Sequence, residues 1–122
     1  MPKGLFRSLT RKRDFEAVFK EGMNSASRYL VVYARPNGLS INRLGLSVSK
    51  RIGKAVTRNR VKRLLREAMR KSLCGVSPNY DFVLVAKKFC VEAELDDFIR
   101  DINGFLSRLT HEEDSDIIDK AL

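Results

Sequence analysis

The stretch from residue 50 to residue 71 constrains the fold more than any other part of this chain. It reads KRIGKAVTRNRVKRLLREAMRK, in which ten residues are Lys or Arg and Glu67 is the only acid. Apolar residues recur within it at helical spacing: Val61, Leu64, Leu65, Ala68 and Met69. Because successive helical residues turn by ~100°, these five share one face and leave the charged residues on the other. The stretch predicts a helix over about 55–72 that packs against a core and exposes a basic face.

The basic face of this helix indicates a polyanionic ligand. Arg58, Lys62, Arg66 and Arg70 follow one another at spacings of four residues, at which like charges repel. A solvated charged face is the ordinary alternative, but such faces mix signs so that neighbouring side chains attract. Phosphate groups would neutralise the repulsion, so the spacing favours nucleic-acid binding.

The distribution of charge supports the same interpretation. The chain has 122 residues, enough for one domain, and a net charge of +9. Residues 1–90 hold 21 basic and 5 acidic side chains, whereas residues 91–122 hold 3 basic and 10 acidic ones. A polyanion is therefore expected to contact the first two thirds of the chain and to avoid the last.

Periodicity and turn residues predict one α+β domain. Thr10 is expected to cap a first helix, and Gly22 to close it. Two β-rich segments separated by about seven residues are expected to form an antiparallel pair, in which Tyr29, Val31 and Tyr33 share one side. The predicted helices cover 11–21, 55–72 and 93–109; the predicted strands cover 28–35, 43–50 and 80–87.

Several functional classes are disfavoured by composition. Cys74 and Cys90 are the only cysteines and His111 is the only histidine, so two free thiols are expected rather than a disulfide or a zinc site. No apolar run is long enough for a signal peptide or a membrane span, which predicts a cytoplasmic protein without membrane contact. The few acids of residues 1–90 do not cluster as nuclease chemistry requires, so no catalytic residue and no metal ligand is expected.

A family resemblance rests on the central motif and its flanks. Arg58-Asn59-Arg60 stands inside the basic helix and follows a GLSVSK strand at residues 45–50. Residues 14–22 carry a DFxxVFKxG segment, and the strand at 80–87 ends in Val-Ala-Lys. Over about residues 8–109 the chain resembles the bacterial ribonuclease P protein subunit.

The resemblance implies a fold and assigns different roles to the protein and to its RNA partner. The fold is a single-domain α-β-β-β-α-β-α sandwich with a left-handed βαβ crossover, similar to domain 2 of ribosomal protein S5. It is expected over residues 1–109, with a flexible acidic tail at 110–122. The catalyst of this family is an RNA that holds the Mg²⁺, and the protein binds no cofactor tightly. As a monomer in a 1:1 ribonucleoprotein, it assists the endonucleolytic removal of the 5′ leader from precursor tRNA.

Two binding surfaces are expected. The first contacts the catalytic RNA and its phosphates through Lys50, Arg51, Lys54, Arg58, Asn59, Arg60, Lys62, Arg63, Arg66 and Arg70. In isolation, Phe15, Phe19 and Tyr33 would most often be core residues. The resemblance instead assigns them to a cleft for the single-stranded leader. That cleft consists of Phe15, Phe19, Val31, Tyr33, Ser47 and Ser49.

Two other classes of protein could carry a basic helix of this kind. A structural or ribosomal RNA-binding protein has no role in tRNA processing, and it has no reason to gather Phe15, Phe19 and Tyr33 in one cleft. A DNA-binding regulator normally carries another helix just before the one that reads the major groove, whereas residues 43–50 are predicted to be a strand. Both alternatives fit the sequence less well.

Overall fold

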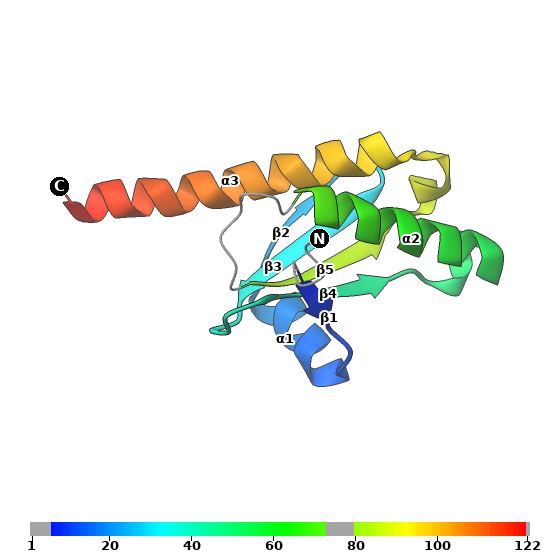
Figure 1. Ribbon diagram of the computed structural model, residues 1–122, viewed down its shortest axis with the longest axis horizontal. Coiled ribbons are helices and arrows are strands. Elements are labelled where there is room, and N and C mark those ends of the chain that lie inside the picture. Colours follow the sequence, from blue (N-terminus) through cyan, green and yellow to red (C-terminus); the bar gives the residue numbers. More distant parts are fainter. Residues whose placement is uncertain (1–5, 73–79, 122) are drawn as a thin grey trace.

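The computed structural model describes the backbone of residues 6–72 and 80–121, and the side chains of residues 6–72 and 80–109. Three helices and five strands occur in these ranges (Figure 1). In chain order they are β1 (Phe6–Ser8), α1 (Lys12–Glu21), β2 (Met23–Ala26), β3 (Leu30–Pro36), β4 (Asn42–Ser47), α2 (Ala55–Ser72), β5 (Tyr80–Ala86) and α3 (Leu95–Ala121). Short 3₁₀ turns at Lys50–Ile52 and Lys88–Glu92 precede α2 and α3.

Strand β5 occupies the centre of the sheet. Among the described residues, the strand order is β1-β4-β5-β3-β2, with β5 parallel to β4 and antiparallel to β3. The predicted pairing of 28–35 with 43–50 is therefore wrong, because β5 lies between these two segments. Its first five residues are buried, and an apolar strand gains most from burial at the centre of a sheet.

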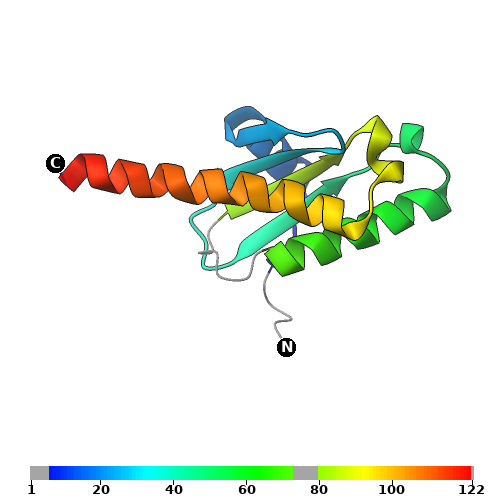
Figure 2. The same cartoon turned by 90° about the horizontal axis from the view of Figure 1, so that it is seen from above.

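The helices cover the two faces of the sheet unequally. Helices α2 and α3 lie on one face and α1 lies on the other (Figures 1 and 2). The larger core lies under α2 and α3, where Leu65, Phe82 and Phe98 are fully buried. On the opposite face, Leu9, Val18 and Val83 form a smaller buried cluster among the described residues. This thinner cover leaves part of that face accessible.

The connection from β4 through α2 to β5 is a left-handed crossover. With α2 in front of the sheet, β4 and β5 both point to the right and β5 lies above β4 (Figure 1). A right-handed unit would place β5 below β4 in this view. The family resemblance predicted this hand correctly, whereas the general preference for right-handed units predicts the opposite one.

The predicted boundaries of two helices require correction. Helix α1 begins at Lys12, and Arg11 rather than Thr10 occupies its N-cap position, without a side-chain cap. Helix α3 begins at Leu95 and continues to Ala121, beyond the predicted end at residue 109. No Gly or Pro after residue 109 interrupts the helix. The predicted bounds of α2 and the closure of α1 by Gly22 are confirmed.

Replacing Gly104 with alanine is expected to raise the free energy of unfolding by about 1 kcal/mol, because alanine costs less than glycine inside a helix. Gly104 is an exposed residue of α3, and a Cβ built there would meet no atom within 4 Å. Urea unfolding measures the change. Gly22→Ala is the control, because its Cβ would lie 2.5 Å from the Val18 carbonyl oxygen; we expect it to destabilise the protein. A loss of stability in Gly104→Ala would contradict the prediction.

Candidate nucleic-acid interface

A cluster of aromatic side chains, at the place of the predicted aromatic cleft, lies on the sheet face that carries α1. The Phe15 ring projects from α1 onto β4, where a Cβ at Gly45 would lie 2.5 Å from Cζ of that ring. One helical turn later, the Phe19 ring meets the Tyr33 ring of β3 edge-on, with 5.0 Å between centroids. Phe19 remains 42% exposed, and Tyr33 is half-buried. The structure therefore brings together Phe15, Phe19 and Tyr33, with one ring well exposed to solvent.

The cross-strand residues next to these aromatic side chains are partly exposed to solvent. Ser47 of β4, Val85 of β5 and Val31 of β3 are cross-strand neighbours, and all three are half-buried. Ser49 is exposed, but it lies beyond the end of β4 at the start of the 3₁₀ turn. Ser47 and Val31 thus share the face of the aromatic residues, as predicted, whereas Ser49 lies past the sheet.

Tyr29 does not belong to this face. It was expected to alternate with Val31 and Tyr33, but β3 begins at Leu30, so the strand alternation does not extend to Tyr29. Its ring instead meets the Phe98 ring edge-on, with 6.3 Å between centroids, on the side of the larger core.

Helix α2 presents the predicted basic face. Val61, Leu65, Ala68 and Met69 are buried, as their spacing predicted, and Leu64 is half-buried. Six of the predicted ligands on or just before this helix are exposed: Lys54, Asn59, Arg60, Arg63, Arg66 and Arg70.

Two of the charges on this helix have partners of their own. Arg70 forms an ion pair with Glu67. Arg58 is half-buried, and its Nε donates to the carbonyl oxygen of Gly53, 3.1 Å away. By contrast, Arg60, Arg63 and Arg66 have no ion-pair partner among the described residues. Their charges are available to an external anion.

The segment before α2 extends the basic surface. Lys50 and Arg51 are exposed in the 3₁₀ turn. Gly53 follows with φ of 155°, a backbone conformation that favours glycine. Val56 is 82% exposed in the first turn of α2. Val56 was not predicted as a site residue, although its helical phase places it near Arg63 on the basic face.

A hollow connects the basic helix with the aromatic cleft. It has a volume of about 180 Å³ and lies at the β1–β4 edge of the sheet. Lys62 and Arg66 of α2 line it on one side, and Thr10 and Phe15 line it on the other. Because Phe15 borders both the hollow and the cleft, the two predicted surfaces are neighbours.

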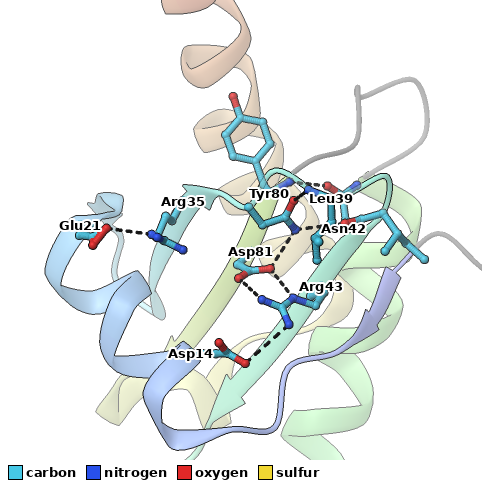
Figure 3. A network of polar contacts seen from close by, with 10 residues as sticks. Asp14, Glu21, Arg35, Leu39, Asn42, Arg43, Tyr80 and Asp81 are labelled. Carbon is cyan, nitrogen blue, oxygen red and sulfur yellow. Dashed lines mark hydrogen bonds and ion pairs between the residues drawn. The ribbon is translucent and has the colours of Figure 1, made fainter.

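A charged row beneath α1 was not recognised in the sequence (Figure 3). Arg43 of β4, Asp81 of β5 and Arg35 of β3 are cross-strand neighbours. Arg43 donates from Nε and Nη2 to the two carboxylate oxygens of Asp81, both at 2.7 Å, and Asn37 donates to the same carboxylate at 2.9 Å. Asp81 is only 1% exposed.

The ionisation of this row follows from its contacts. Burial opposes the charged form of Asp81, but the hydrogen bonds from Arg43 and Asn37 outweigh it and hold the pKa of the carboxyl below its ordinary value. The hydrogen bonds from Arg43 to Asp81 also raise the pKa of the Arg43 guanidinium, although burial acts against the shift. Both groups are therefore charged at neutral pH. A lone acid inside the apolar run of β5 was the sequence signal for such a partner.

Other functional classes find little support among the described residues. No group of three or more His, Cys, Asp or Glu side chains in this part of the chain is placed to hold a metal ion. No helix within the same ranges has the length and apolar character needed to cross a membrane. Cys90 is a buried free thiol, as expected, and Cys74 lies outside the described residues. The aromatic cleft lies beside a basic helix on which Arg60, Arg63 and Arg66 lack an ion-pair partner among the described residues. This arrangement indicates a small RNA-binding protein of the α+β class.

Comparison with known proteins identifies the family. The family model of ribonuclease P matches residues 5–110. The chain belongs to the ribonuclease P protein family, whose members are protein components of an endoribonuclease that processes tRNA. The identification from the Arg58-Asn59-Arg60 motif and its flanks is thereby confirmed.

Individual relatives agree with this assignment. The ribonuclease P protein component of Clostridioides difficile strain 630 is 39% identical over 103 residues, which cover 84% of this chain and 90% of the relative. That of Caldanaerobacter subterraneus is 42% identical over 100 residues, which cover 82% and 86%. The solved structure of the RNase P protein from Thermotoga maritima matches with a TM-score of 0.73 and 32% identity, covering 84% and 96%. The Staphylococcus aureus RNase P protein also gives a TM-score of 0.73, with 28% identity and coverage of 84% and 94%.

Proposed function

We propose that this chain holds the single-stranded 5′ leader of precursor tRNA in the aromatic cleft while the catalytic RNA of ribonuclease P hydrolyses the substrate. The observation that carries this proposal is the 42% exposed Phe19 ring, supported edge-on by Tyr33. Aromatic stacking tolerates any base sequence, which suits a leader whose sequence varies between precursors. Val31 and Ser47 would line the path beside the rings.

The catalytic RNA is the proposed ligand of α2 and of the basic segment before it. Arg60, Arg63 and Arg66 offer charges that no described carboxylate neutralises, and phosphate contacts of this kind dominate affinity for nucleic acid. Asn59, exposed among them, supplies an amide for hydrogen bonds to RNA or to water. The Mg²⁺ of the reaction would be held by the RNA, and one protein would serve one RNA in the cytoplasm.

Reconstitution tests this function. Purified protein is added to the catalytic RNA of its host at low Mg²⁺, and cleavage of a precursor tRNA is measured by the release of its leader. We expect the mixture to cleave faster than the RNA alone and the protein alone to cleave nothing. Mg²⁺-dependent cleavage by rigorously RNA-free protein would contradict this expectation and would make Asp14 and Glu67 candidate metal ligands.

The same assay tests the alternative that this chain is a structural RNA-binding protein without a role in tRNA processing. A protein that only supports RNA architecture would bind the catalytic RNA without favouring substrates that carry a leader. Equal stimulation with leader-bearing precursor and with a substrate that has a single leader nucleotide would favour this alternative. A greater stimulation with the longer leader supports a role in substrate binding.

A further inference from the structure

The charged row beneath α1 reaches both ends of that helix. Arg43, already bound to Asp81 through Nε and Nη2, points Nη1 at the Asp14 carboxylate of α1, 3.6 Å away. On β3, Arg35 contacts Glu21 in the last turn of α1 at 3.1 Å. Figure 3 shows both contacts, with α1 lying across the sheet between them. Two arginines on the strands that flank Asp81 therefore each contact one end of the helix.

The two contacts differ in geometry and in exposure to solvent. The side chains of Arg43 and Asp14 are about one quarter exposed, whereas Glu21 is about half exposed. The Arg35–Glu21 pair is a hydrogen bond of 3.1 Å, but solvent screens it; the Arg43–Asp14 pair is longer, at 3.6 Å, and better shielded from solvent. The end of α1 is also held by its backbone, since the Gly22 N–H donates to the Val18 carbonyl and β2 pairs with β3 directly afterwards. The chain just before α1 is tied to β4, because β1 pairs with that strand and the Leu9 N–H donates to the Leu44 carbonyl at 2.8 Å. Within the first turn of α1 itself, the Asp14–Arg43 ion pair is the charged side-chain contact to the sheet.

Asp14 immediately precedes Phe15, and Arg43 lies two residues before Gly45 on β4. A contact between Asp14 and Arg43 therefore fixes the place at which the Phe15 ring meets the strand. Because Phe19 follows one turn later on the same helix, its position over Tyr33 depends on the same restraint.

We propose that Arg43, oriented by Asp81, is a positioning residue that sets the aromatic cleft by holding Asp14 and thereby the first turn of α1 over β4. Asn37 completes the arrangement, because it donates both to Asp81 and to the Ile41 carbonyl and so ties the carboxylate to the β3–β4 loop. The consequence for leader binding rests on the function proposed above. The placement of the Phe15 ring over β4 is independent of that proposed function.

The test uses Asp14→Asn, which removes the charge and keeps the shape. Glu16→Gln is the matched control, because it removes the same charge from an exposed residue of α1 that has no ion-pair partner among the described side chains. Asp14→Glu keeps the charge and should restore the contact. The first readout is the NMR chemical shift of the Gly45 Hα protons, which the nearby Phe15 ring current displaces. Phe15→Leu gives the value of this shift without the ring.

We expect Asp14→Asn to move the Gly45 Hα shift toward its value in Phe15→Leu, with Glu16→Gln unchanged and Asp14→Glu close to the original protein. The second readout is the ratio of affinities for long-leader and leaderless precursor, measured with the reconstituted holoenzyme. Asp14→Asn should lower this ratio about five-fold, the smaller end of the contribution of one stacked base. A merely stabilising contact would lower the melting temperature and leave both readouts at the control values.

The outcomes separate the two proposals. If the Gly45 shift in Asp14→Asn equals that in Glu16→Gln, Arg43 does not position the cleft. If the Gly45 shift moves but neither Asp14→Asn nor Phe19→Ala changes the affinity ratio, the positioning role is supported and leader binding in the cleft is refuted.

Discussion

Phe19→Ala is expected to weaken the binding of precursor tRNA only when the precursor carries a leader. The Phe19 ring is 42% exposed, so its removal should cost far less stability than the ~3–5 kcal/mol typical of a buried Phe. A base stacked on an aromatic ring contributes about 1–3 kcal/mol, so the dissociation constant should rise about five- to 150-fold. Affinity of the holoenzyme for long-leader and leaderless tRNA, together with thermal unfolding of each variant, measures the effect.

Phe89→Ala is a matched control for this experiment. Phe89 is also 42% exposed, but it lies in the 3₁₀ turn after β5 and contacts Arg28 rather than α1. We expect its removal to leave the preference for a leader unchanged. Phe15→Ala is a less selective variant, because the Phe15 ring also packs against the smaller core. If Phe19→Ala lowers the melting temperature strongly and weakens the affinity for both substrates equally, Phe19 has a structural role and does not bind the leader.

The double variant Arg63→Ala/Arg66→Ala is expected to weaken binding to the catalytic RNA and to reduce its dependence on salt. Each lost phosphate contact lowers the slope of log K against log salt concentration by about 0.7–0.9, so the double variant should lose about 1.4–1.8. Both side chains are exposed and lack a carboxylate partner among the described residues, so little stability should be lost. Filter binding over a range of KCl concentrations measures the slope.

Arg100→Ala provides the control for charge alone. Arg100 is exposed on α3 and pairs with Asp97, outside the basic surface. It should leave the slope unchanged. An unchanged slope in the double variant would show that the basic face of α2 is merely solvated, whatever the absolute affinity.

The sequence predicted those elements whose pattern is strong within the element itself. Helix α2 has the predicted bounds because Val61, Leu65 and Met69 mark its buried face without ambiguity. Strands β1 and β2 were missed because FRS and MNSA are short and largely polar. They become strands because β4 and β3 offer them unpaired backbone groups, which is a tertiary effect.

The parts of the candidate site differ in how far the sequence predicted them. The basic residues followed from charge and spacing, whereas the aromatic cleft followed from the family resemblance, because Phe15, Phe19 and Tyr33 have the spacing of ordinary core residues. The neighbours of Asp81 were not predictable, since Arg43 and Arg35 lie beside it only through the strand order β4-β5-β3. No spacing along the chain encodes that juxtaposition.

The central position of β5 has a consequence for how the nascent chain folds during translation. Strands β3 and β4 precede β5 in sequence, yet each pairs with β5 rather than with the other. Until Tyr80–Ala86 has emerged, both strands keep an open edge, and such edges promote association between chains. Non-local pairing of this kind also slows folding, because a long loop must close first. A nascent chain or a fragment that ends before Tyr80 is thus the form of this protein most exposed to aggregation.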